Sequence, residues 1–279
     1  MTNHYESRTI NVISLNAMLD KKRTDQGLIL PQDERVQSLA ATINNFSAEK
    51  SVVGVQEVFK SAAQHNGEVL AELCGYGPGF CVEHNQRQNA YPGDNRGRAD
   101  EYLLMFGELV DRVDDIDLGD CRHAALADIG GIAIAMVHPR AGRSLKARSA
   151  RKDQMITLVD ALSGYESAVV FGDLNEPPVR YVSAGRDYLG RHGFRSANAL
   201  LRQPYPRTYP TDAYKEIRGI TRPLPLDDIL VRGERVRVLA AGVLEAVTEQ
   251  RAQTEKYSAA PMEASDHVGV FATLDLGQI

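Results

Sequence analysis

Apolar positions along the chain follow two recurring patterns. Short runs rich in Val and Ile predict β-strands, whereas longer stretches with apolar residues three and four positions apart predict helices. Several of the short runs are apolar at every position, which is typical of central strands covered on both faces. The expected strands are residues 10–16, 51–58, 102–106, 132–138, 168–172, 228–232 and 268–274. The pattern therefore predicts an α/β (α+β) fold.

Two segments have helical spacing. Residues 36–46 carry apolar side chains on one face and follow Asp33, which we expect to be the N-cap. A second helix is expected around residues 155–162, ending near Gly164. Residues 84–98 are polar and rich in turn formers, which predicts a long surface loop. No internal repeat or linker interrupts the pattern, so a single domain over residues 1–279 is the expected organisation.

Composition narrows the classes of protein. The chain has 279 residues, of which 43% are hydrophobic, enough to bury a sizeable core. Its cysteines, Cys74, Cys81 and Cys121, form no CxxC pair, so we expect thiols in a reducing compartment rather than a zinc site. No apolar run approaches the roughly 20 residues that a transmembrane helix needs, and no signal peptide is recognisable, so we expect a cytoplasmic protein. The net charge of −5 disfavours non-specific nucleic-acid binding but leaves a local basic cleft open.

Polar side chains stand where several predicted strands end or begin. Alone, a polar residue at a strand end is usually a turn residue. As a set, carboxylates, amides and histidines without nearby cysteine favour a hard divalent cation and phosphoryl chemistry. The residues are Asn16, Glu57, His138, Asp173, Asn175, Asp227, Asp228, Asp266 and His267.

The order of the motifs is more specific than any one of them. LNA, VQE, a strand ending in His138, GDLN, DDILV and SDH follow one another over nearly the whole chain. This series resembles the endonuclease/exonuclease/phosphatase (DNase I-like) superfamily. The resemblance implies a four-layer α/β/β/α sandwich, in which two stacked mixed β-sheets are flanked by helices.

The same resemblance implies roles for these residues around one metal. Glu57 is expected to be the principal ligand of Mg²⁺, with Mn²⁺ as the alternative ion, and Asn16 and Asp266 would bind the same metal directly or through water. Asp173 would orient and deprotonate the attacking water. Asn175 would hold the phosphate or steady Asp173.

Two histidines are expected to contact the phosphate. His267 would donate to a non-bridging oxygen while Asp227 fixes its ring and keeps it protonated, and His138 would be a second donor. Neighbouring strand residues point to opposite faces, so only one of Asp227 and Asp228 can serve His267, and we favour Asp227. A histidine at position 138 is similar to the DNase-like, sphingomyelinase-like and phosphatase-like branches, whereas branches that cut abasic sites carry tyrosine.

Further residues are candidates for substrate contacts. Arg140 and Arg143 follow the strand that ends at His138, and Arg98 lies in the polar loop; such charges also occur on ordinary solvated surfaces. Thr208 and Tyr209 resemble a family segment that lines the substrate cleft, although PRTYP also fits a simple turn between prolines.

The leading hypothesis is a Mg²⁺-dependent hydrolase that cleaves a phosphate mono- or diester by metal-assisted in-line attack of water. An alternative is a nuclease or DNA-end processing phosphodiesterase similar to the tyrosyl-DNA phosphodiesterase branch. That alternative needs a basic groove with stacking aromatics, and a chain without tryptophan and with 6% aromatic residues disfavours it. A third hypothesis is an inactive relative that serves as a binding or scaffold protein, which the presence of the whole polar set disfavours. The sequence makes no prediction of oligomeric state.

Overall fold

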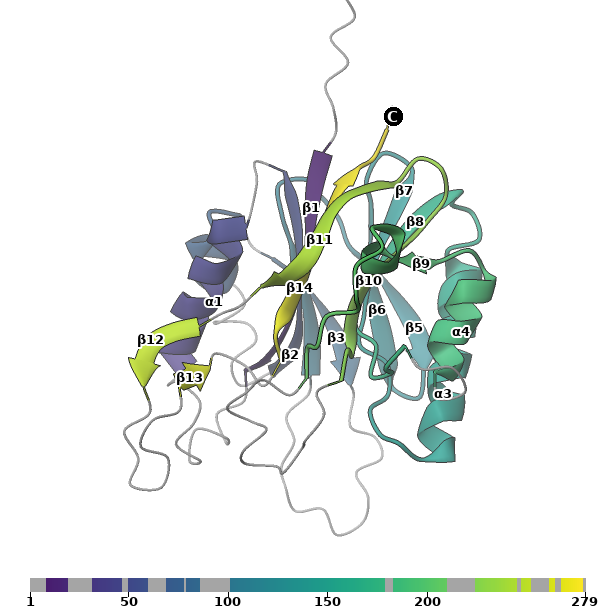
Figure 1. Cartoon of the computed structure of the whole chain (residues 1–279), viewed down its shortest axis with the longest axis horizontal. Helices are drawn as coiled ribbons and strands as arrows, with labels where there is room; N and C mark the ends of the chain where they lie inside the picture. The colour runs from purple at the N-terminus through teal and green to yellow at the C-terminus, as the bar shows by residue number, and fades with distance from the viewer. Residues whose placement is uncertain are drawn as a thin grey trace, which may run out of the picture.

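The computed structural model describes residues 9–19, 32–46, 50–59, 69–77, 79–85, 101–178, 183–209, 224–244, 247–251, 261–263 and 267–277. Two mixed six-stranded sheets run through its middle (Figure 1). In order, the first contains β11 (Arg237–Leu244), β14 (Gly269–Asp275), β1 (Thr9–Leu19), β2 (Ser51–Phe59), β4 (Glu101–Phe106) and β3 (Phe80–Asn85). The second contains β5 (Asp114–Gly119), β6 (Arg122–Asp128), β7 (Ile132–Val137), β8 (Ser167–Asp173), β10 (Asp227–Arg232) and β9 (Arg195–Ser196). A separate pair joins β12 (Val247–Arg251) to β13 (Pro261–Glu263).

The main core lies between the two sheets. Because side chains alternate along a strand, every second residue of the central strands points into this layer. Val12 of β1, Met136 of β7 and Phe171 of β8 belong to it and are fully buried. At Gly54 of β2 the sheets pack so closely that an added Cβ would lie 2.4 Å from the Phe171 ring.

Helices cover the outer faces. The helix α1 (Gln32–Phe46) packs Leu39 and Ile43 against the first sheet. On the second sheet, α3 (Leu145–Ala161) and α4 (Ala184–Arg191) contribute Leu158 and Leu189 to a third hydrophobic cluster. The short α5 (Ala197–Leu200) follows β9. This is the four-layer α/β/β/α sandwich that the motif series implied, and the prediction of the fold class is confirmed.

All seven predicted strands are present, with ends that differ by a few residues from the predicted ones. The pattern missed β3, β5, β6, β9, β11, β12 and β13, which are short or carry exposed residues. Asp33 is not an N-cap, because α1 already begins at Gln32. The second helix begins well before the predicted span, with Ser144 as its N-cap accepting from the Ala147 N–H at 3.1 Å. Residues 84–85 end β3 instead of opening a loop, and residues 86–98 lie outside the described residues.

Strand directions bring the polar strand ends together. β1 runs parallel to β2, and β7 parallel to β8, with a helix in each connection, so the carboxyl ends of each pair share one edge of their sheet. The hydrogen bond between Asn16 and Asp173 shows that the two edges lie on the same side of the sandwich. β14 and β10 run antiparallel to β1 and β8, so their amino ends lie on the same side. The residues at these ends therefore face one another across the gap between the sheets.

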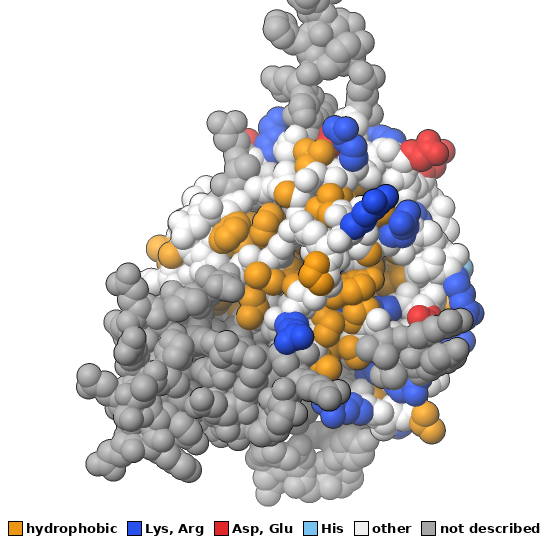
Figure 2. Space-filling view, in the orientation of Figure 1, with side chains coloured by type: hydrophobic (Ala, Val, Ile, Leu, Met, Phe, Trp, Pro, Cys, Tyr) orange, Lys and Arg blue, Asp and Glu red, His pale blue; other side chains and the backbone are white. Residues whose placement is uncertain are grey.

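One face of the molecule shows hydrophobic side chains with arginine and lysine around them (Figure 2). Among the described residues, exposed large hydrophobics include Tyr205 and Leu239, and β11, which carries Leu239, is an edge strand. Arg237 at the start of β11 is exposed and pairs with Asp275 at 2.7 Å. Charges at a sheet edge disfavour pairing with a further strand.

No helix in the described part of the chain is long and apolar enough to cross a membrane.

Candidate active site

Asp173 is at the centre of the polar cluster. It ends β8 and its side chain is 2% exposed. The Asn16 amide, in the last part of β1, donates from Nδ2 to Asp173 Oδ2 at 3.2 Å and to Glu57 Oε1 at 3.1 Å. One amide group therefore connects two carboxylates that belong to different sheets.

Two histidines approach the same carboxylate oxygen. Nε2 of His138 lies 3.6 Å from Asp173 Oδ2, and Nε2 of His267 lies 3.7 Å from it. Both distances exceed that of a direct hydrogen bond. His138 Nε2 is also 3.9 Å from Glu57 Oε1. The two imidazoles thus present their Nε2 atoms to one small region beside Asp173.

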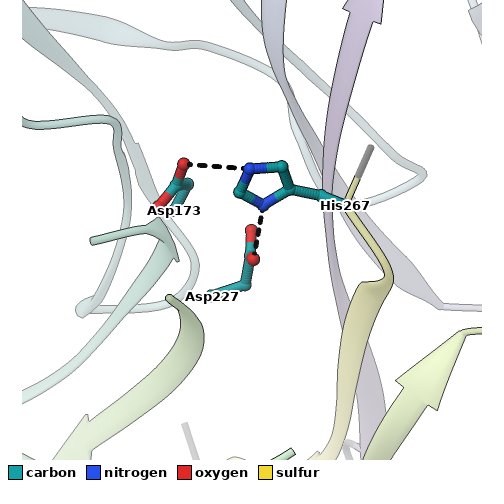
Figure 3. Close-up of side chains that lie close together, drawn as sticks. All are labelled: Asp173, Asp227 and His267. Carbon is teal, nitrogen blue, oxygen red and sulfur yellow. Dashed lines mark hydrogen bonds and ion pairs between the residues drawn. The ribbon is translucent and has the colours of Figure 1, made fainter. Parts of the chain in front are cut away.

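The ring of His267 is held from its other side. Its Nδ1 lies 2.8 Å from Asp227 Oδ2, while its Nε2 faces Asp173, so the ring stands between two carboxylates (Figure 3). Asp227 is 1% exposed, and its Oδ1 has no hydrogen-bond partner among the described residues. The pairing with His267 is therefore the main compensation for burying this carboxylate.

Asp228 points the other way. It is completely buried, forms an ion pair with Arg186, and accepts from Ser196 Oγ at 2.8 Å. The neighbour Ile229 belongs to the core between the sheets, on the same face of β10 as Asp227. Alternation along β10 thus brings Asp227, and not Asp228, to His267.

The backbone at Glu57 is unusual. Its φ is +56°, in the left-handed region that a non-glycine residue rarely adopts. The pairing of β2 with β4 shifts register between Val55 and Val58, on either side of Glu57. Such an irregularity re-aims a side chain at a strand end, and left-handed backbone costs about 1–2 kcal/mol per residue. Strain of this kind is common at functional sites.

The turn after Asp173 is held by its own side chains. Asn175 has a φ of +52°, its backbone N–H donates to Asp173 Oδ1 at 2.8 Å, and its Nδ2 donates to the Pro139 carbonyl at 3.1 Å. Asparagine tolerates this conformation better than most residues. The turn fixes the Asp173 carboxylate and joins the end of β8 to the residue after His138.

Gly172 allows β7 and β8 to approach at this point. A Cβ added to it would lie 1.9 Å from the Val137 carbonyl oxygen, and its φ is +140°. No other residue fits this position without displacing the backbone. The glycine of GDLN is therefore the reason that His138 and Asp173 lie close together.

Thr208 and Tyr209 surround the Asp227–His267 pair. Thr208 is fully buried, and its Oγ1 accepts from the N–H groups of Leu226 and Asp227, each at 3.0 Å. Its carbonyl accepts from Val268 N–H at 2.8 Å, directly after His267. The ring of Tyr209 packs on the His267 ring, with centroids 4.7 Å apart. Thr208 thus holds the backbone next to Asp227 and His267, a role that the PRTYP motif did not suggest.

The arginines expected to grip substrate differ in their surroundings. Arg140 forms an ion pair with Asp120 in the turn between β5 and β6. Arg143 is exposed just before α3. Asp266, an expected metal ligand, and Arg98, an expected phosphate contact, lie outside the described residues.

The donor set fits a hard divalent cation. Glu57, 26% exposed at its side chain, and Asn16 supply a carboxylate and an amide beside Asp173, and Mg²⁺ and Mn²⁺ prefer such oxygen ligands. Asp173, Asp227 and His267 also offer ligand atoms within 4.8 Å of one another. In that second group, however, a cation would compete with the 2.8 Å bond between His267 and Asp227. The Glu57 side of Asp173 is the better place for a metal.

Sequence reasoning missed a buried ionic network behind the site. Glu176 accepts from Arg151 Nε at 2.9 Å, and the backbone N–H of Arg186 donates to its Oε2 at 3.0 Å. Glu176 and Arg151 are 1% and 2% exposed. The only local signal was the position of Glu176 directly after GDLN.

Two stacked mixed sheets, helices on their outer faces and a polar cluster at one shared edge define the DNase I-like class of α/β sandwich. The family model described as Endonuclease/Exonuclease/phosphatase family matches residues 26–267. The chain belongs to this family, and the resemblance recognised in its motifs is confirmed. No curated protein matches it in sequence.

Solved structures with this fold cover nearly the whole chain at low identity. An endonuclease/exonuclease/phosphatase family protein from Bacteroides thetaiotaomicron is 15% identical, with a TM-score of 0.70 over 99% of this chain and 100% of that one. The mannosyl-6-phosphatase of the same organism is 15% identical, with a TM-score of 0.66 over 95% and 99%. D. rerio TDP2 complexed with single strand DNA product is 15% identical, with a TM-score of 0.65 over 96% and 99%.

Proposed function

We propose that the chain is a divalent-metal-dependent phosphoesterase in which Asp173 activates water for in-line attack on a phosphate ester. The observation that carries the proposal is the convergence of the two Nε2 atoms, 3.6 and 3.7 Å away, on Asp173 Oδ2. A carboxylate and two imidazoles in one small region supply a base and two donors. Phosphoryl transfer needs this combination of a group that aims water and groups that neutralise charge.

Each residue has a separate task. Asp173 Oδ2 orients the water and accepts its proton, while the Asn16 amide and the Asn175 N–H hold the carboxylate in place. Nε2 of His267 donates to a phosphate oxygen. Because Nδ1 is bonded to Asp227, the carboxylate stabilises the doubly protonated ring that this donation requires. His138 supplies the second donor.

Glu57 and Asn16, together with Asp266, are the residues we assign to the metal. When bound, Mg²⁺ or Mn²⁺ would polarise a phosphate oxygen and help to neutralise the charge of the transition state. The left-handed backbone of Glu57 keeps its carboxylate at the rim of the gap between the sheets, where it is partly exposed. Partial exposure suits a cation that retains several waters.

The surroundings of Arg140 favour a small phosphate ester over a long nucleic acid as the proposed substrate. Arg140 was expected to hold a further phosphate, but its guanidinium forms an ion pair with Asp120 in the β5–β6 turn. Both a mannosyl-6-phosphatase and a TDP2 complexed with single strand DNA product share the fold. We therefore propose a small phosphate ester as substrate, with single-stranded DNA as the second candidate.

The test is hydrolysis of p-nitrophenyl phosphate, bis-p-nitrophenyl phosphate, mannose 6-phosphate and single-stranded DNA, with Mg²⁺, Mn²⁺ or EDTA. Asp173→Asn removes the proposed base. Asp128→Asn is the matched control, since Asp128 also accepts a backbone N–H, from Gly131 at 2.7 Å, but lies at the opposite end of β6 from the site. We expect turnover that depends on the metal, survives Asp128→Asn and disappears with Asp173→Asn. Turnover that persists in Asp173→Asn, or none with any substrate, contradicts the proposal.

A further inference from the structure

One buried guanidinium joins the two segments that carry the site. Arg186 lies on α4, and its side chain is 8% exposed. Its Nε donates to the Glu176 carbonyl at 2.6 Å, and its NH1 forms the ion pair with Asp228. Its NH2 donates to the carbonyls of Pro225 at 3.3 Å and Leu226 at 3.1 Å. Planar guanidinium is suited to this arrangement because its donors point in several fixed directions at once.

The carbonyls of Pro225 and Leu226 belong to the segment that leads into β10. Leu226 directly precedes Asp227, and its carbonyl also accepts from the Leu174 N–H at 3.0 Å, next to Asp173. On the opposite side, the N–H groups of these two peptides, those of Leu226 and Asp227, donate to Thr208 Oγ1, each at 3.0 Å. The position of the Asp227 carboxylate therefore depends on a short piece of backbone with Arg186 on one side and Thr208 on the other.

The start of α4, which carries Arg186, is itself held by hydrogen bonds to Glu176. Oε2 of Glu176 accepts from the N–H groups of Gly185 at 2.9 Å and Arg186 at 3.0 Å, at the start of α4. Arg151 holds the other oxygen of Glu176, and its NH1 donates to the carbonyls of Arg140 and Gly142. The start of α4 is thus fixed to the loop after Asn175 and to the segment after His138.

We infer that Arg186 is a positioning residue of the active site, which holds the backbone before Asp227 so that Asp227 stays paired with His267. It touches neither substrate nor metal, and Asp228 serves to anchor its guanidinium. The inference rests on the proposed function, because its consequence is measured in the hydrolysis that Asp173 and His267 perform.

The test compares two substitutions of a buried or partly buried arginine by lysine in the full chain. Arg186→Lys keeps a positive charge beside Asp228 but loses the NH2 group that donates to the carbonyls of Pro225 and Leu226. Arg232→Lys is the matched control: Arg232 lies at the far end of β10 and donates from NH2 to the carbonyls of Leu162 at 2.8 Å and Tyr165 at 2.9 Å. Both variants lose arginine bonds to backbone carbonyls, at opposite ends of one strand.

We expect Arg186→Lys to lower kcat for bis-p-nitrophenyl phosphate at least tenfold with KM changed less than threefold, and Arg232→Lys to leave both constants near wild type. In the double variant with Asp227→Asn, the loss should be close to that of Asp227→Asn alone, since both act through one carboxylate. An unchanged kcat in folded Arg186→Lys, or losses that multiply in the double variant, overturns the inference. If Arg186→Lys does not fold, Asp228→Asn replaces it, with a smaller fall in kcat expected and an unchanged kcat contradicting the inference. Absence of hydrolysis in the wild-type protein instead overturns the proposed function.

Discussion

His267 lies just before β14 of the first sheet and Asp227 begins β10 of the second, yet Nδ1 of the imidazole lies 2.8 Å from Oδ2 of the carboxylate. The pair connects the segment before β14 to the start of β10 and leaves the second ring nitrogen facing Asp173. Its geometry depends on how the sheets stack, so changes at either strand, or at the segments that brace them, should alter catalysis in ways that can be measured.

Replacing Asp227 by Asn should lower kcat by about 10²- to 10⁴-fold, since the ring of His267 loses the charge that favours its protonated form. Steady-state hydrolysis of bis-p-nitrophenyl phosphate measures this loss. The control is Asp115→Asn, because Asp115 Oδ1 pairs with His123 Nδ1 at 2.7 Å and this aspartate is half exposed. Equal activities of the two variants would show that the pairing at His267 has no catalytic role.

Thr208→Val should lower both stability and kcat, because it leaves the buried N–H groups of Leu226 and Asp227 without their acceptor. An unsatisfied buried donor costs about 1–3 kcal/mol. Urea unfolding and steady-state kinetics measure the two effects. Thr208→Ser keeps the hydroxyl and should retain most of both; if Ser and Val lose the same amount, side-chain volume and not the hydroxyl decides.

Glu57→Gln should weaken binding of Mg²⁺ roughly 10- to 100-fold, since a charged oxygen ligand becomes neutral. Thermal unfolding at increasing Mg²⁺ reports the affinity without reference to turnover, because a bound ion stabilises the folded state. The control Glu234→Gln changes an exposed glutamate between β10 and β11. If the wild-type melting temperature does not respond to Mg²⁺, or if Glu57→Gln leaves the response unchanged, Glu57 is not a ligand of the metal.

Gly172→Ala should destabilise the fold by about 2–4 kcal/mol, because its Cβ would lie 1.9 Å from the Val137 carbonyl at a φ of +140°. Urea unfolding measures the loss. Gly164→Ala is the control, since a Cβ at Gly164 meets nothing within 4 Å. Similar free energies of unfolding for the two variants would mean that β7 and β8 can separate at little cost.

Burial raises the pKa of the Cys74 thiol to about 12, whereas Cys81 is exposed. In the native protein a thiol reagent at pH 8 should therefore modify Cys81 quickly and Cys74 only on unfolding. Unfolded Cys74 ionises near its ordinary pKa of 9.0, so between that pH and about 12 the unfolded chain binds fewer protons. The free energy of unfolding should fall as pH rises through this range, and less so in Cys74→Ala. Rapid modification of Cys74 in the native protein would contradict its burial.

The central strands were predictable because their residues are apolar on both faces and must be covered on both sides. The edge strands were not: β5, for example, carries Asp114, Asp115 and Asp117, whose charges resemble those of a loop. The N-terminal half of α3 was missed for a similar reason, since its basic residues hide the helical period until Met155 and Leu158.

The sequence by itself determined the family, the order of the motifs and that Asp227 and Asp228 point to opposite faces of their strand, because period and strand ends are local properties of the chain. The tertiary structure alone decided that Asn16 donates to Asp173, 157 positions away, that Arg140 pairs with Asp120, and that Thr208 and Arg186 hold the backbone before Asp227. The physical reason is that a buried donor needs an acceptor at a particular distance and angle. Stacking of the two sheets, and not any local pattern, determines which groups meet that requirement.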